Sequence, residues 1–239
     1  MPKRLAAALA ASCLLCLTLA AQNKKSKDWT EWSKDEAQKM LNDSPWAQTQ
    51  TYTDTSQMTY SPTAPGVASS SAGQGATNQA TNVKYRIRFF SARPVRQALV
   101  RSILLGMKSP PDAQTLERLK GFAELQASNS IIVTVSYEAS DGRLAGAAMQ
   151  NFGAATTGSL KNSTYLERKD GKRLFLAEYV PPGKDGFGAR FIFPRELDGR
   201  PFVTPEAGEV RFFSPVARSA ELNMRFKVER MIYNDALEY

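Results

Sequence analysis

Three Asp-Gly dipeptides divide the sequence past residue 160, and they constrain its fold more than any other feature. They stand at Asp170-Gly171, Asp185-Gly186 and Asp198-Gly199. Asp-Gly readily adopts the positive-φ backbone of tight turns, and the segments between these turns are rich in β-branched and aromatic residues. The pattern predicts antiparallel hairpins, with strands over 165–167, 173–180, 189–193, 209–213 and 222–232.

The middle of the chain mixes strand and helix patterns. From Val83 to Phe89, apolar side chains alternate with Lys84, Arg86 and Arg88, which is typical of a strand with one buried face. Apolar stripes at helical spacing predict helices over 94–105 and 112–126, a β-prone run predicts an interior strand over 131–138, and a short helix is expected over 143–152. These elements predict an α+β fold, with a largely antiparallel sheet of about six or seven strands and two or three helices on one face.

An N-terminal helical arm over 21–47 is expected to precede this domain. Ser33 and Glu36 have the spacing of a capping box, in which each side chain accepts a hydrogen bond from the other residue's backbone, so a helix is expected over 34–42. Ser44-Pro45 is typical of a second helix start. The arm contains all of the tryptophans of the chain, Trp29, Trp32 and Trp46.

A threonine-rich segment and an uncharged one connect the arm to the main domain. Alternating threonines predict a strand over 48–55. Residues 56–82 carry no charge and few large apolar side chains, which is typical of a flexible loop or linker. The segment either tethers a separate arm or lets strand 48–55 pair with strand 83–89. We favour pairing, because an isolated strand needs a partner, and we place the α+β domain at 83–239.

The first twenty residues have the pattern of a secretory signal peptide. Lys3 and Arg4 precede an apolar run over 5–19, and small residues allow cleavage after Ala20 or Ala21. We therefore expect a periplasmic or secreted protein. An uncleaved membrane anchor and a lipoprotein modified at Cys13 are the alternatives.

Cleavage would remove both cysteines, Cys13 and Cys16, from a chain that has no histidine. Losing Lys3 and Arg4 would also lower the net charge from +8 to +6. A mature protein without Cys or His has no disulfide, no Cys nucleophile, no Ser-His-Asp triad and no His-based metal site. We expect neither a metal nor a cofactor, and the basic charge favours acidic partners.

Three motifs resemble an uncharacterised family of exported bacterial proteins with a Trp-rich mature N terminus. They are W-T-E-W at Trp29 to Trp32, N-D-S-P-W at Asn42 to Trp46, and the stretch from N-S-T-Y-L to F-I-F-P-R, Asn162 to Arg195. The resemblance implies export and an arm that belongs to the domain. It implies no functional residues, since no activity is known for that family.

A cationic sheet face is the first candidate site. If strands 83–89 and 222–228 share one sheet whose apolar face lies under the helices, five cations point outward together: Lys84, Arg86, Arg88, Arg225 and Lys227. Such a face could bind an anionic polymer. The competing interpretation is that these are solvated cations that protect the strands against edge pairing.

Two other candidates are weaker. Glu178 falls in line with apolar residues of its strand, and Arg190 lies symmetrically across the turn near Lys184, so the pair could form a perturbed carboxylate site or a structural ion pair. The tryptophans Trp29, Trp32 and Trp46 could contact a ligand, or they could dock onto the domain and cap its core.

We expect a binding or structural module without catalytic activity, in contact with an envelope protein or an anionic polymer. One alternative is a carboxylate-based hydrolase or lyase that acts on cell wall or polysaccharide, and another is a small-ligand carrier with a cavity between helices and sheet. Nucleic acid is not an expected partner. Membrane contact is expected only through an uncleaved signal segment or peripheral binding.

Overall fold

The computed structural model describes residues 27–54, 81–125, 129–217 and 221–239. The signal peptide predicted over 1–20 lies outside these residues, and so do residues 56–80 of the predicted linker.

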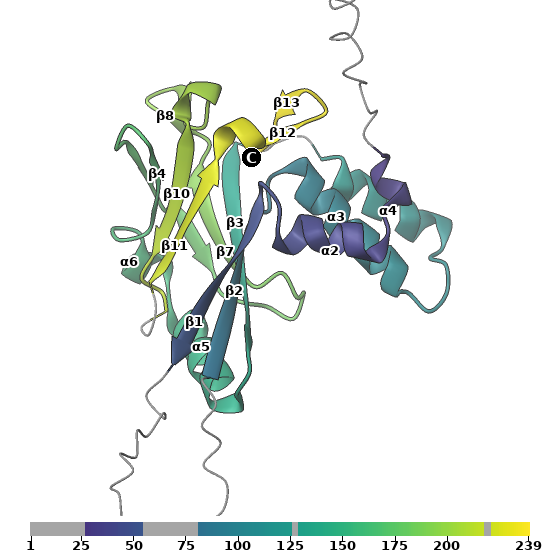
Figure 1. Cartoon of the computed structure of the whole chain (residues 1–239), viewed down its shortest axis with the longest axis horizontal. Helices are drawn as coiled ribbons and strands as arrows, with labels where there is room; N and C mark the ends of the chain where they lie inside the picture. The colour runs from purple at the N-terminus through teal and green to yellow at the C-terminus, as the bar shows by residue number, and fades with distance from the viewer. Residues whose placement is uncertain (1–26, 55–80, 126–128, 218–220) are drawn as a thin grey trace, which may run out of the picture.

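Two antiparallel sheets form the body of the protein (Figure 1). The first sheet has five strands, in the order β1 (Ala47–Asp54), β2 (Thr81–Phe89), β3 (Ser130–Ala139), β7 (Ala189–Pro194) and β6 (Glu178–Val180). The second sheet has four strands, in the order β11 (Leu222–Lys227), β10 (Glu209–Ser214), β4 (Tyr165–Arg168) and β5 (Arg173–Phe175). Two short hairpins complete the strands, β8 (Glu196–Leu197) with β9 (Arg200–Pro201), and β12 (Ile232–Tyr233) with β13 (Ala236–Leu237).

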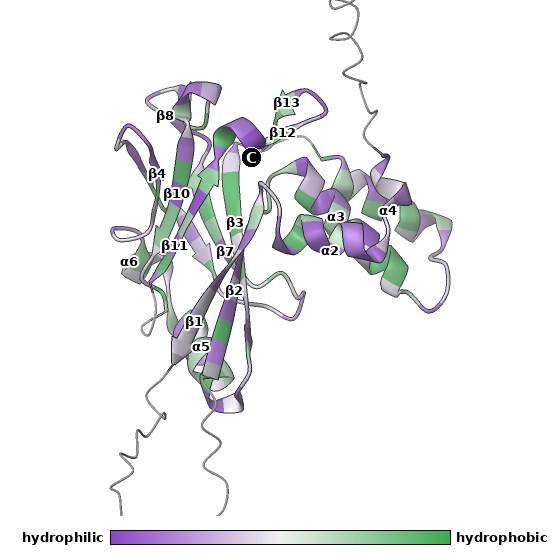
Figure 2. Ribbon diagram, viewed as in Figure 1, coloured by the Kyte–Doolittle hydropathy of each residue, from purple (hydrophilic) through white to green (hydrophobic). Residues whose placement is uncertain are grey.

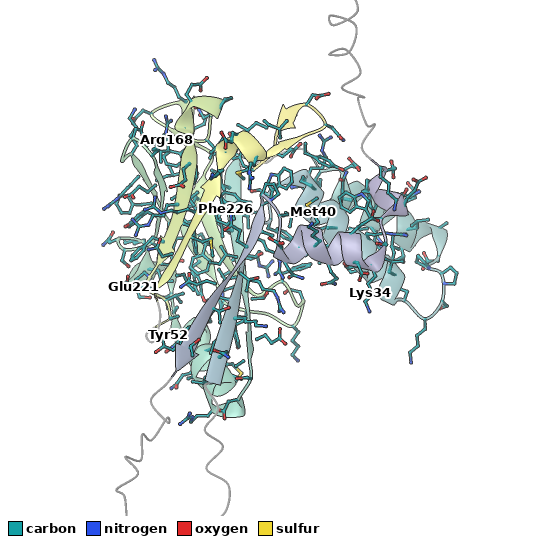
Figure 3. The ribbon with its side chains drawn as sticks, viewed as in Figure 1. Lys34, Met40, Tyr52, Arg168, Glu221 and Phe226 are labelled. Carbon is teal, nitrogen blue, oxygen red and sulfur yellow. The ribbon has the colours of Figure 1, made fainter. Side chains whose placement is uncertain are left out.

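The core lies between the two sheets. The ring of Phe89 on β2 meets the ring of Phe226 on β11, with centroids 4.9 Å apart, and Phe191 on β7 meets Phe212 on β10 at 5.2 Å. In Figure 3, Phe226 lies in the space between β11 and the strands of the first sheet. All of these rings are fully buried. Burial of apolar surface stabilises the packing of the two sheets, and the edge-to-face aromatic pairs add to this stabilisation.

The helices occupy two places. The 3-10 turn η1 (Trp29–Glu31) and the helices α2 (Lys34–Asn42), α3 (Arg93–Gly106) and α4 (Ala113–Ala123) form a layer beside the first sheet, with α3 packed between α2 and α4 (Figure 1). The helix α5 (Gly142–Ala154) lies at the lower end of the sheets in Figure 1, and α6 (Thr157–Leu160) lies on the left, on the side away from the layer of α2, α3 and α4. Two further 3-10 turns are η2 (Pro205–Ala207) and η3 (Val228–Arg230).

The predicted α+β class, the antiparallel sheet with helices on one face and the N-terminal helix are confirmed. The arrangement differs from the prediction in one respect, because the strands are divided between two sheets. The apolar face of β2 therefore packs against the second sheet and, at Tyr85, against α5, and not beneath α2, α3 and α4. Figure 2 shows apolar residues along the strands of both sheets and also on the helices.

The arm follows local sequence rules up to its last turn. The capping box is present, since Ser33 Oγ accepts from the Glu36 amide at 3.2 Å and Glu36 Oε2 accepts from the Ser33 amide at 2.6 Å. The second helix start predicted at Ser44-Pro45 is wrong. The Ser44 hydroxyl instead donates to the Met40 carbonyl at 2.7 Å, and the chain turns directly into β1.

The strand pairings reproduce most of the predicted hairpins. Each of the three Asp-Gly dipeptides past residue 160 connects paired antiparallel strands, namely β4 with β5, β6 with β7, and β8 with β9. The pairing predicted between 48–55 and 83–89 is also confirmed, because β1 pairs with β2 along its whole length. The strand predicted over 173–180 is divided, since the chain leaves the second sheet after Phe175 and enters the first sheet at Glu178.

Helix α5 closes one end of the core. The Phe152 ring stacks on Tyr137 with centroids 5.5 Å apart and lies 6.1 Å from Tyr85, and the backbone carbonyl of Phe152 accepts a 2.6 Å hydrogen bond from the Tyr179 hydroxyl. Burial raises the pKa of Tyr179 well above its ordinary value. The short helix predicted over 143–152 is thus confirmed, and its Phe152 ring packs on the apolar face of the first sheet.

Candidate functional site

The five cations predicted to share one face lie on two faces. Lys84, Arg86 and Arg88 belong to β2 in the first sheet, whereas Arg225 and Lys227 belong to β11 in the second sheet. The two sheets pack by their apolar faces, so their polar faces point away from each other. The single cationic face is therefore wrong, although the alternation within each strand is correct.

The three cations of β2 differ in their surroundings. Lys84 is exposed, and Arg86 forms an ion pair with Glu138 of β3. Arg88 reaches under α2, where Nε donates to the Leu41 carbonyl at 2.6 Å. Its two Nη atoms donate to the Ser136 hydroxyl at 2.9 Å and to the Asn42 side chain at 3.1 Å. Burial and the neighbouring Arg86 lower the pKa of Arg88 to about 10, so it remains charged at neutral pH.

Glu178 and Arg190 do not form the predicted pair. Glu178 is exposed and lies opposite Ile192, while Arg190 lies opposite Val180. The Arg190 guanidinium instead binds Asp185 at 2.6 Å within the same hairpin. The predicted register was wrong by two residues, because Glu178 lies opposite Ile192 and not opposite Arg190. The hydrolase hypothesis loses the arginine partner on which it depended.

The tryptophans dock onto the domain. The exposed fractions of Trp29, Trp32 and Trp46 are 7%, 8% and 3%. The Trp46 indole donates to the Glu238 carbonyl at 2.7 Å and packs edge-on against Tyr233. Rings buried to this extent offer little surface to a ligand, so the geometry favours the core-capping interpretation.

A polar groove of about 820 Å³ lies where the arm meets the second sheet, and we name it the β1–β11 groove. Its lining comes from α2 and the following turn, from β1, from the start of β10, and from β11 and η3: Lys39, Asn42, Asp43, Ser44, Pro45, Gln48, Thr49, Glu209, Arg225, Lys227 and Arg230. The groove therefore includes Arg225 and Lys227, the two predicted cations of β11. It places beside them residues that are far away in the sequence.

The charge of the groove is mainly positive. Arg225 pairs with Glu209 at 2.6 Å, which compensates one cation. Lys39, Lys227 and Arg230 are exposed, and within the described ranges they form no ion pair. Three cations thus face Asp43 and the C-terminal end of α2, whose dipole is equivalent to about half a negative charge. The groove keeps an excess of positive charge.

Glutamines of β1 set the distance between the walls of the groove. Gln48 donates to the Arg225 carbonyl at 3.0 Å. Gln50 donates to the Glu221 carbonyl at 2.7 Å and accepts from the Asn223 amide at 2.9 Å. These bonds cross between the two sheets and tie the backbone of β11 to β1, so the cations of β11 are held on a fixed strand.

Sequence reasoning missed Lys39 and Arg230. Lys39 stands in the last turn of α2, where a cation is favourable for the helix dipole, so its position in the sequence does not indicate a groove. Arg230 was hidden by the strand predicted over 222–232, because that strand ends at Lys227 and the 3-10 turn η3 directs Arg230 toward the groove. The polar residues that follow Val228 were the available signal that the alternation stops there.

The outer face of the second sheet carries a further cluster that the sequence did not single out. Glu167 lies between two arginines, with 2.5 Å to Arg173 and 3.2 Å to Arg211. The hydrogen bond from Arg173 is the main reason that the pKa of Glu167 lies below its ordinary value. Arg173 also covers the Tyr165 ring, 4.3 Å from its centroid. These contacts satisfy one another across the strands, which favours a structural role.

No family model matches the chain, and neither a curated protein nor a solved structure was found that matches it. In the part of the chain that the structure describes, no helix is long and apolar enough to cross a membrane.

Proposed function

We propose that this protein is an exported module without catalytic activity that binds an anionic polymer, such as an acidic polysaccharide, in the β1–β11 groove. The observation that carries the proposal is the convergence of Lys39, Lys227 and Arg230 from separate elements on one groove. Cations that gather at a concave surface raise the local concentration of an anionic ligand.

The uncharged part of the lining supports a polysaccharide over a simple polyanion. Asn42, Ser44, Gln48 and Thr49 provide amide and hydroxyl groups beside the cations. Such groups both donate and accept hydrogen bonds, as sugar hydroxyls do. The volume of about 820 Å³ has room for more than one sugar unit.

Export belongs to the same proposal, because an envelope or extracellular polymer is met only outside the cytoplasm. The molecular mass of the protein recovered from the periplasm or the medium tests whether the signal peptide is cleaved on export. We expect a chain that begins at Ala21 or Gln22. A full-length chain in the cytoplasmic fraction would contradict export.

The binding experiment measures the affinity of the mature protein for polygalacturonate, with neutral dextran as the control polymer. We expect binding to polygalacturonate only, and a steep loss of affinity between about 0.05 and 0.5 M NaCl, because salt screens exposed charges.

A matched pair of variants separates the groove from net charge. The double variant Lys227→Ser/Arg230→Ser removes two groove cations, and we expect the affinity to fall by about tenfold or more. The control Lys84→Ser/Lys108→Ser removes the same charge from exposed positions outside the groove, and we expect a change of less than about twofold. An equal loss in both variants, or affinity that does not change with salt, would refute the groove as the site.

A further inference from the structure

A second cavity lies between the helices and the outer face of the first sheet, and we name it the Arg88 pocket. It has a volume of about 300 Å³. Its floor consists of Arg86 and Arg88 from β2 and of Thr134 and Ser136 from β3. It is separate from the β1–β11 groove, although Leu41 at the pocket and Asn42 at the groove are neighbours in α2.

The walls of the Arg88 pocket are apolar. Val95 and Leu99 of α3 line one side, and Leu41 of α2 lines another. The rim comes from the loop between β6 and β7, where the Phe187 ring packs against Phe90 with centroids 5.2 Å apart. In Figure 1 this loop, drawn in green, extends from the sheet toward the helical layer.

The rim loop is held in place by two contacts. Asp185 accepts from the Phe187 amide at 3.1 Å and binds Arg190 at 2.6 Å. Gly188 has a φ of +82°, and a side chain there would overlap the backbone carbonyl of Val135. The pocket is therefore bordered by an ordered hairpin, which suits a preformed ligand site.

Arg88 is the only uncompensated charge on the floor. Arg86 is paired with Glu138, whereas Arg88 binds neutral oxygens and has no carboxylate partner among the described residues. A guanidinium has five N–H groups, and three of those of Arg88 are used, so two remain. The Ser136 oxygen accepts from Arg88, which leaves the Ser136 hydroxyl hydrogen free to donate. A largely buried cation without a counterion is costly, and an anionic ligand would compensate it.

We propose that the Arg88 pocket binds a small monocarboxylic acid with an apolar body, the carboxylate at Arg88 and Ser136 and the body between α3 and the rim loop. One uncompensated cation matches one negative charge, whereas a phosphate dianion would exceed it. The volume fits a ligand of about ten heavy atoms, since ligand sites begin at about 300 Å³. This site is independent of the proposed polymer groove.

Calorimetric titration of the mature protein with octanoate tests the proposal, with octanol and acetate as controls. Octanol keeps the apolar body and lacks the charge, and acetate keeps the charge and lacks the body. We expect octanoate to bind about tenfold or more tightly than either control. Equal affinity for octanol and octanoate, or the absence of octanoate binding at about 1 mM, would overturn the proposal.

Variants locate the site. Leu99→Phe narrows the pocket without touching Arg88, and we expect it to weaken octanoate binding by about tenfold. Arg88→Met tests the charge, and Ser136→Ala tests one hydrogen bond if Arg88→Met does not fold. Lys84→Met is the matched control, because it removes an exposed cation from the same face of β2, and its affinity should equal that of the wild type. Unchanged affinity in Leu99→Phe would place octanoate elsewhere and refute the assignment.

Discussion

Replacing Phe152 by alanine tests whether α5 is part of the hydrophobic core. The Phe152 ring is fully buried and contacts Tyr137 and Tyr85, at centroid distances of 5.5 and 6.1 Å. The substitution keeps the backbone carbonyl that accepts from Tyr179, so that hydrogen bond remains. Any loss in the free energy of unfolding therefore comes from removal of the ring alone.

The magnitude follows from cavity formation. Phe→Ala substitutions in cores lower the free energy of unfolding by about 3–5 kcal/mol, which combines the lost transfer energy with the cost of the empty space. Because the Phe152 ring is fully buried, we expect a loss within that range. For a domain of this size, such a loss corresponds to a fall of about 10 °C in the melting temperature.

Urea unfolding followed by circular dichroism measures the free energy directly. The control is Met149→Ala on the same helix, because Met149 is 65% exposed and its removal should change stability by less than about 0.5 kcal/mol. A loss below about 1 kcal/mol for Phe152→Ala would show that α5 is not part of the core.

Two further predictions concern pH and backbone strain. Burial raises the pKa of Tyr179, so the folded state binds this proton more tightly than the unfolded state, and its stabilising contribution is present below about pH 10 and lost as the pH rises further. The urea midpoint should fall between about pH 8 and pH 11, and Tyr179→Phe should make this fall smaller; an identical pH dependence in both proteins would contradict the interpretation. Gly188→Ala should lower stability by about 3 kcal/mol or more, since it combines a positive φ with overlap on Val135, whereas Gly186→Ala, with a φ of +77° and open space, should cost about 1 kcal/mol. Thermal melts of the two glycine variants measure the difference, and equal losses would refute it.

Local patterns in the sequence were sufficient to predict most elements. Alternation identified the strand from Val83 to Phe89, and the capping box located the helix that follows Ser33. The Asp-Gly turns worked for a physical reason, as the Asp198-Gly199 turn shows. Both residues have positive φ there, 54° and 72°, which few other residue pairs adopt easily.

The division into two sheets could not be predicted in this way. An apolar face shows that a strand is buried, but it does not show whether a helix or another sheet covers it. The apolar faces that hold Phe89 on β2 and Phe226 on β11 would have fitted either arrangement, and only the complete set of pairings distinguishes the two. Whether the five predicted cations share one face depends on whether their strands belong to one sheet or to two.

Both proposed sites depend on contacts between distant parts of the chain. The β1–β11 groove joins Lys39 to Arg230, and the Arg88 pocket joins Leu41 to Phe187. Neither pair leaves a periodic signal in the sequence. The Glu178 and Arg190 prediction failed for a related reason, because the change of sheet after Phe175 reverses which side chains are buried, so that Tyr179 and not Glu178 faces the core.

Lysine footprinting tests the groove most directly, because it compares the two cationic faces in one experiment. The mature protein is acetylated with and without polygalacturonate, and modification is measured by mass spectrometry at Lys39, Lys227 and Lys84, all of which are exposed. We predict that the polymer slows modification of Lys39 and Lys227 by about fivefold and leaves Lys84 unchanged, since only the first two line the groove. Protection of Lys84 without protection of Lys227 would contradict the account.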